Sequence, residues 1–102
     1  MNPTIAQRKP EIDAMCRLYR VRRLELFGSA AVGRDTPGKS DLDFLVEFES
    51  LPPGSYSNAY FGLLEALTAL FACPVDLVVA SAIENPYFLQ SVEQTKALLY
   101  AA

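Results

Sequence analysis

Three aspartates stand in two short segments that otherwise read as β-strands, and they restrict how this chain can fold. Asp41 and Asp43 belong to the segment 41–48, and Asp76 belongs to the segment 75–79. Aspartate is depleted in strands, so its presence in these apolar, alternating segments needs an explanation. Residues two apart in a strand point the same way, so Asp41 and Asp43 share one face. Paired carboxylates on a rigid strand, joined by a third from another strand, suit a hard divalent cation such as Mg²⁺.

A Gly-Ser pair closes the preceding apolar strand, at about 22–27, and offers a place for a phosphate. Gly28 permits a tight turn and a close approach of the backbone. Ser29 is expected to cap a short helical turn whose free N–H groups can bind anionic oxygens. Gly33 is expected to end this turn, before a loop over residues 34–40.

Helical segments surround these strands. Pro10 opens a helix with an apolar stripe, and a second helix is predicted over residues 57–71. Near the end of the sequence, Asn85 caps and Pro86 opens a helix expected to reach about Leu99. The predicted order is helix, strand, turn of helix, strand, helix, strand, helix.

The place of the site residues within each strand determines the expected topology. The Gly-Ser pair lies at the C-terminal end of its strand, whereas Asp41 and Asp76 lie at the N-terminal ends of theirs. These groups meet only if the first strand is antiparallel to the second and the second is parallel to the third. The predicted fold is one α/β (α+β) domain over residues 1–102, with a small mixed three-stranded sheet and helices packed on one face.

Alternation along the strands assigns side chains to two faces. The apolar set would face the helices: Leu24, Leu26, Leu42, Phe44, Val46, Val75, Leu77 and Val79. The acidic set would share the open face: Glu25, Asp41, Asp43, Glu47 and Asp76. A sheet covered on one side has a polar wet side in any case, so alternation alone does not indicate catalysis. The crowding of three carboxylates at one edge does favour a site, because bare carboxylates repel one another.

Composition excludes several kinds of site. The chain has no histidine, which removes Ser-His triads, histidine general bases and most zinc sites. Cys16 and Cys73 lie in apolar segments without metal-ligand spacing and are expected to be reduced, buried thiols. Any metal is therefore expected to be held mainly by oxygen.

The net charge of −3 hides an asymmetry along the chain. Residues 1–40 hold eight of the nine basic residues and four acids, whereas residues 41–102 hold eight acids and one base, Lys96. The acidic balance argues against a general nucleic-acid binder. One dense basic cluster is either a solvated helix end and strand start or a contact for phosphate or an acidic partner. It consists of Arg17, Arg20, Arg22 and Arg23.

Hydrophobic residues make up 51% of the chain, which suggests an apolar patch that a partner chain could cover. No apolar run approaches the ~20 residues needed to cross a bilayer. The first residues lack the apolar core of a signal peptide, so a cytoplasmic protein without membrane contact is expected.

Together these features predict a nucleotidyl-transfer site. Asp41 and Asp43 would bridge two magnesium ions to the nucleotide phosphates, beside the phosphate-binding pair Gly28-Ser29. Asp76 would be a third ligand and could take the proton of the attacking hydroxyl. Asp76 follows Asp43 by 33 residues, and the combination in this order is more specific than any one motif.

Three strings resemble the minimal nucleotidyltransferases (MNT) of the DNA polymerase beta superfamily: LFGSAA at 26–31, SDLDFLVEF at 40–48 and VDLV at 75–78. The tail, at 84–88 and 98–102, resembles the C-terminal helix of MntA-type members. The resemblance implies a polymerase beta-like nucleotidyltransferase fold. It also implies an antitoxin that uses ATP and Mg²⁺ to transfer AMP to a tyrosine of a partner HEPN ribonuclease toxin of the HepT type, which silences the toxin.

The resemblance also assigns residues. The family's nucleotide-binding Gly-Ser corresponds to Gly28 and Ser29, and its catalytic, metal-binding aspartates correspond to Asp41, Asp43 and Asp76. One departure concerns Val32, which stands where many members have an arginine before the glycine matched to Gly33. Arg34 or another nearby arginine would have to replace its phosphate contact.

Two other functions compete with this interpretation. The chain could neutralise a toxin by contact alone, with its catalytic groups unused, which Val32 and the apolar surplus would suit. It could instead act as a nucleotidyltransferase on a small molecule or RNA, although the acidic balance and the absence of room for a second domain argue against this.

Overall fold

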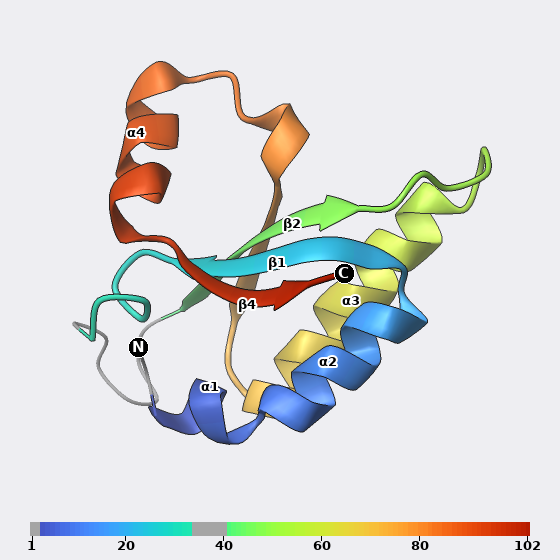
Figure 1. Cartoon of the computed structure of the whole chain (residues 1–102), viewed down its shortest axis with the longest axis horizontal. Helices are drawn as coiled ribbons and strands as arrows, with labels where there is room; N and C mark the ends of the chain where they lie inside the picture. The colour runs from blue at the N-terminus through green and yellow to red at the C-terminus, as the bar shows by residue number, and fades with distance from the viewer. Residues whose placement is uncertain (1–2, 34–40) are drawn as a thin grey trace.

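The computed structural model describes residues 3–33 and 41–102, and the predicted loop over 34–40 lies outside the described residues. The strands form a single sheet, and the helices pack around it (Figure 1). In chain order the elements are α1 (Pro3–Gln7), α2 (Lys9–Leu18), β1 (Val21–Phe27), β2 (Leu42–Phe48), α3 (Tyr56–Phe71), β3 (Val75–Val79), the 3-10 helix η1 (Ala80–Ala82), α4 (Pro86–Thr95) and β4 (Ala97–Ala101).

The sheet has the order β3-β2-β1-β4. β1 pairs with β2 in antiparallel orientation and β2 pairs with β3 in parallel, as the sequence predicts. α3 provides the crossover that a parallel pair requires. This topology brings the C-terminal end of β1 and the N-terminal ends of β2 and β3 together. These strand ends form the edge of the sheet at which the candidate site lies.

The prediction of three strands and of a final helix reaching Leu99 was wrong. α4 ends at Thr95, Lys96 is extended with φ −62° and ψ 143°, and the next residues form β4 against β1. In a three-stranded sheet the outer edge of β1 would present unpaired backbone groups, and β4 satisfies them. Leu99, at 4% exposure, joins the main core from this strand.

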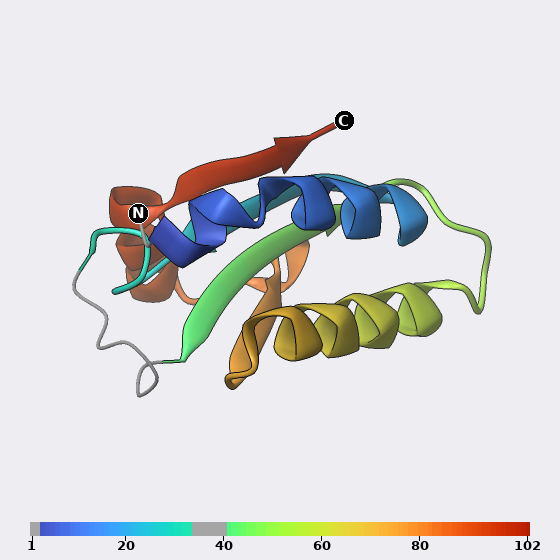
Figure 2. The ribbon, with the colours of Figure 1, turned by 90° about the horizontal axis from the view of Figure 1, so that it is seen from below.

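Helices α2 and α3 cover one face of the sheet, which holds the main core (Figures 1 and 2). Ile12 and Cys16 of α2 and Leu63 and Leu67 of α3 are fully or almost fully buried there. All eight strand residues predicted to face the helices belong to this core or pack against it. The helices approach closely because Gly62 has no side chain where the ring of Tyr19 lies.

The second face is covered in part by α4, which lies on the opposite side of the sheet from α2 and α3 (Figure 1). Val92 of α4 is fully buried with Phe27 of β1 and Leu45 of β2. The prediction that all helices pack on one face is therefore right for α2 and α3 and wrong for α4. The part of this face that α4 leaves uncovered carries the aspartates.

Candidate active site

The strand register joins two of the three aspartates. Asp43 of β2 stands directly beside Asp76 of β3, and on the other side it faces Phe27 of β1. Asp43 is half-buried, whereas Asp41 and Asp76 are exposed. Asp41 directly precedes β2 and acts on Asp43 through its charge. The predicted acids therefore gather at one edge of the sheet.

The Gly-Ser turn lies against the same carboxylate. Gly28 directly follows β1 and has φ +75°, a left-handed conformation that favours glycine. A Cβ atom at Gly28 would lie 2.5 Å from Oδ2 of Asp43. A side chain at this position would therefore collide with the carboxylate, so the sequence needs glycine here for two separate reasons.

The surroundings of Asp43 disfavour its charged form. Burial raises the pKa of its carboxyl group, and the negative charges of Asp76 and then Asp41 raise it further. Carboxylates held this close together disfavour one another's charged form. A divalent cation would remove the repulsion, because it favours the ionised form of every carboxylate that it contacts.

Magnesium suits the donor atoms at this edge. Mg²⁺ is usually bound through one or two carboxylates together with waters and substrate phosphates. Asp43 and Asp76 supply such a pair from adjacent strands. Across residues 3–33 and 41–102, no three acidic, cysteine or histidine side chains already form a metal cluster.

Residues 29–33, the expected phosphate-binding segment, form turns and not the short helix that the sequence predicts. The N–H of Ala31 donates to the carbonyl of Gly28 at 3.2 Å, and Gly33 has φ +75° as its predicted role requires. The N–H of Gly28 donates to Oγ1 of Thr95 at 3.0 Å. Thr95 was absent from the predicted site, since no local pattern links it to a turn 67 residues earlier.

Most of the basic cluster is engaged elsewhere. Arg20 pairs with Glu49 at 3.1 Å, and Arg22 pairs with Glu47 at 3.5 Å. Arg23 pairs with the buried Glu25 at 3.2 Å, and Lys96 adds a second cation to the same carboxylate. These contacts favour the interpretation of the cluster as a solvated helix end and strand start.

The cysteines and Val32, which were also singled out in the sequence, make no contact with the described residues that assigns them a role in the site. Both cysteines are free thiols, but only Cys16 is buried as predicted, and Cys73 is half-buried. Burial raises the pKa of Cys16 to about 12. Val32 is 40% exposed at the turn. Arg34, the proposed replacement for an arginine at that position, lies outside the described residues.

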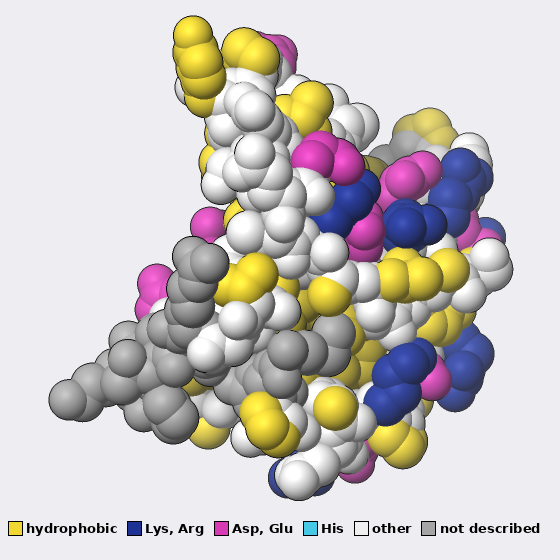
Figure 3. Space-filling model, turned by 60° about the vertical axis from the view of Figure 1, so that its left-hand side comes forward, with side chains coloured by type: hydrophobic (Ala, Val, Ile, Leu, Met, Phe, Trp, Pro, Cys, Tyr) yellow, Lys and Arg dark blue, Asp and Glu magenta, His cyan; other side chains and the backbone are white. Residues whose placement is uncertain are grey.

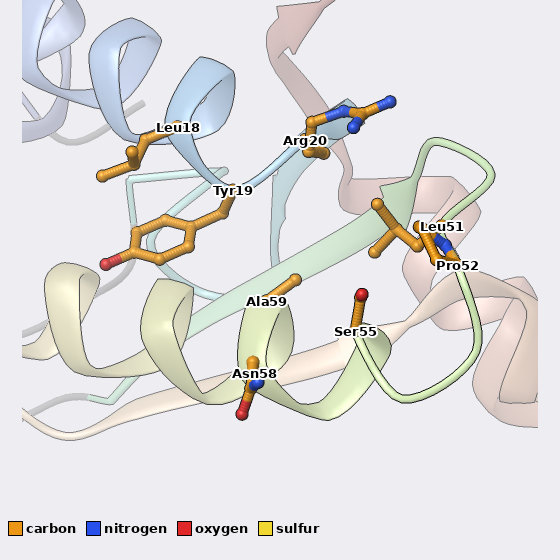
Figure 4. A pocket seen from close by; sticks show the side chains of 8 residues that line it. All are labelled: Leu18, Tyr19, Arg20, Leu51, Pro52, Ser55, Asn58 and Ala59. Carbon is orange, nitrogen blue, oxygen red and sulfur yellow. The ribbon is translucent and has the colours of Figure 1, made fainter.

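A pocket of about 340 Å³ lies between the end of α2 and the start of α3 (Figure 4). Its lining includes Tyr19, Arg20, Leu51 and Ser55. Arg20 precedes β1 and Leu51 follows β2, so the pocket is at the end of the strands opposite to the aspartates. It is separate from the candidate site.

Comparison with known proteins identifies the family of this chain. The profile of the nucleotidyltransferase domain family matches residues 12–99. The chain belongs to this family. Two proteins of Methanocaldococcus jannaschii are similar to it: "Putative protein adenylyltransferase MJ1379" is 40% identical, and "Putative protein adenylyltransferase MJ0128" is 42% identical. Each match spans 76 residues, which is 74% of this chain and 74% of the relative.

Several solved structures share the fold of this chain. A structure described as a putative minimal nucleotidyltransferase has a TM-score of 0.75 and 28% identity, over 95% of both chains. A toxin–antitoxin structure with AMP-PNP has a TM-score of 0.69 and 22% identity, over 92% of this chain and 73% of the other. A tri-AMPylated Shewanella oneidensis HEPN toxin in complex with its MNT antitoxin gives 0.64 and 19%, over 96% and 73%. The predicted fold class and the predicted enzyme class are confirmed.

Within the described part of the chain, no helix has the length and apolar character needed to span a bilayer.

Proposed function

We propose that this nucleotidyltransferase is an antitoxin that transfers AMP from ATP to a tyrosine of a HEPN ribonuclease toxin of the HepT type, with Mg²⁺ as cofactor. The observation that carries the proposal is the register of the strands, which places Asp43 beside Asp76 and against Gly28. A nucleotide whose phosphates rest on the Gly28-Ser29 turn would reach both carboxylates.

The nature of the donor and acceptor rests on the relatives. The two M. jannaschii proteins are named as protein adenylyltransferases, which favours ATP as donor and a protein as acceptor. Among proteins with the same fold, one toxin–antitoxin structure holds AMP-PNP, and another contains a HEPN toxin already modified with AMP. These neighbours suggest both the nucleotide and the partner for this chain.

The chain's own residues would divide the work as follows. The Gly28-Ser29 turn would hold the phosphates close to the sheet, and Asp41, Asp43 and Asp76 would hold the metal. Bound magnesium supplies positive charge that offsets the phosphates and orients the reacting groups. In the transfer, the acceptor hydroxyl oxygen forms a bond to the α-phosphorus of ATP as the bond to the pyrophosphate oxygen breaks. Asp76, exposed at the edge, would accept the proton of that hydroxyl.

An apolar surface supports a protein partner. Hydrophobic side chains gather at the outer end of α4, which projects from the body of the molecule (Figure 3). Tyr87 is 81% exposed there, Phe88 39% and Leu89 43%. Exposed apolar clusters of this kind mark protein interaction sites. We propose that the HEPN toxin covers this end of α4.

The proposal is tested by incubating the protein with Mg²⁺, ATP labelled on its α-phosphate, and a HEPN protein encoded beside it. We expect label on the HEPN protein, because AMP transfer carries the α-phosphate to the acceptor and transfer of the γ-phosphate does not. A HEPN protein with its acceptor tyrosine changed to phenylalanine should remain unlabelled. Absence of label, in a reaction where a known adenylyltransferase works in parallel, would refute the proposal.

A second function is favoured by one observation. Val32 is 40% exposed at the turn where many family members carry an arginine, which would suit an antitoxin that acts by contact alone. The double variant Asp41→Asn/Asp43→Asn separates the two functions. Loss of protection against the toxin, with the complex still formed, favours AMP transfer; protection that survives favours contact.

A further inference from the structure

The position of the Gly28-Ser29 turn depends on a residue from the far end of the chain. The N–H of Gly28 donates to Oγ1 of Thr95 at 3.0 Å, across a part-buried contact. The same hydroxyl bonds back into α4, to the carbonyl of Ser91 at 3.1 Å and to that of Val92 at 3.5 Å. Because Thr95 donates its proton into its own helix, its lone pairs are directed to the turn.

Helix α4 is anchored firmly enough to hold this contact. Val92 is fully buried with Phe27 and Leu45, and the ring of Phe88 packs edge-to-face on Phe27, with the centroids 5.9 Å apart. On the other side of Thr95, Lys96 reaches the buried Glu25 of β1 at 3.7 Å. Thr95 therefore lies between two points at which α4 is fixed to β1.

Small movements of the turn have direct consequences for the site. The backbone at Gly28 lies so close to Asp43 that an added Cβ would lie 2.5 Å from the carboxylate oxygen. Gly28 also has the conformational freedom of glycine, which gives the turn few restraints of its own. The hydrogen bond to Thr95 adds a restraint from outside the turn on its distance from Asp43.

We propose that Thr95 is a positioning residue for nucleotidyl transfer, and that its hydroxyl holds the Gly28-Ser29 turn against Asp43 in the conformation that receives the phosphates. The inference rests on the proposed function, because it assigns the turn to the nucleotide. It also assigns the Gly28 N–H to the protein rather than to the ligand, so the phosphates would meet Ser29 and the residues after it.

The test compares Thr95→Val, which keeps the shape and loses the hydroxyl, with Thr95→Ser, which keeps the hydroxyl. Ser91→Ala, on the preceding turn of α4, is the matched control. The net value of one hydrogen bond predicts that Thr95→Val weakens binding of AMP-PNP with Mg²⁺ by roughly 3- to 10-fold. Thr95→Ser and Ser91→Ala should stay within about twofold of the unchanged protein. Equal affinity of Thr95→Val and the unchanged protein, or tighter binding by Thr95→Val, would overturn the proposal.

A second measurement needs no ligand. Amide hydrogen exchange at Gly28, followed by NMR, should be faster in Thr95→Val than in Thr95→Ser, with the amides of β1 unchanged. Unchanged exchange at Gly28 would overturn the hydrogen bond itself. Faster exchange, in a protein that binds no nucleotide even when unchanged, would refute the proposed function and leave the structural contact in place.

Discussion

Asp43 is the residue at which burial and charge act together. Its carboxyl group is half-buried beside Asp76, and burial followed by the charges of Asp76 and Asp41 raises its pKa. The unfolded chain loses this proton at the ordinary value, about pH 4. Between that value and the raised one, the folded protein binds more protons than the unfolded chain. Folding stability therefore falls as the pH rises through this interval.

This predicts that Asp43→Asn is more stable than the unchanged protein at about pH 7 in metal-free buffer, because the buried charge is removed. The gain should shrink as the pH falls toward about pH 3, where both proteins carry a neutral group. Urea unfolding across this range measures the effect. Glu47→Gln is the control, since Glu47 lies on the same strand, is exposed and pairs with Arg22. A variant that is no more stable at neutral pH would contradict the assigned environment of Asp43.

Gly28 allows a second prediction. Gly28→Ala adds both the strain of φ +75° and a collision with Asp43, so we expect it to destabilise the fold by about 2–3 kcal/mol. Gly54→Ala, at φ +86° with no atom within 4 Å of the new Cβ, should cost only about 1 kcal/mol. Chemical denaturation measures both. An equal loss of folding stability in both variants would show that the collision with Asp43 does not destabilise Gly28→Ala.

The sequence indicates that Asp43 and Gly28 belong to a site because aspartate and glycine are uncommon in β-strands. Aspartates in strands and a glycine before serine at a strand end are visible without a structure. Thr95 is different, since threonine near a helix end has no distinctive chemistry. Its contact with Gly28 becomes visible only after the chain has folded.

Among the elements, the C-terminal segment shows where local patterns mislead. Leu98, Leu99 and Tyr100 continue the apolar spacing of α4, so the sequence favours one long helix. The segment instead becomes β4 because β1 has a free edge, and pairing with it is a long-range interaction. The strands β1, β2 and β3 have a strong local signal, and their bounds agree with the prediction within one residue. The Asn85 cap is also confirmed, as its side chain accepts from the N–H groups of Tyr87 and Phe88.

The attachment of α4 to the sheet is testable with one buried and one exposed residue. Val92→Ala removes buried methyl groups that pack on Phe27 and Leu45, and should cost roughly 2 kcal/mol of stability. Leu89→Ala, on the same helix but 43% exposed, should change stability by less than about 0.5 kcal/mol. Urea titration of both variants checks this. Similar losses would mean that α4 is not held by the cluster around Val92.

At the scale of the whole molecule, topology makes the site. The aspartates and the Gly-Ser turn come from three strands, and they meet because β1 runs against β2 while β3 runs with it. That arrangement was predictable because no other pairing of these strands brings the groups together. The cover that α4 gives the second face was not predictable, since Val92 and Phe27 have no local relation in the sequence.

The most direct test that the aspartates and the Gly28-Ser29 turn form one nucleotide site is the change in melting temperature on adding AMP-PNP with Mg²⁺. A ligand that binds only the folded state at ~100 times its Kd should raise the melting temperature by about 10 °C in a domain of this size. We predict this shift for the unchanged protein and for Glu47→Gln, and its loss in both Asp43→Asn and Asp76→Asn. An equal shift in all four proteins would contradict the account, because the nucleotide would then bind without the paired aspartates.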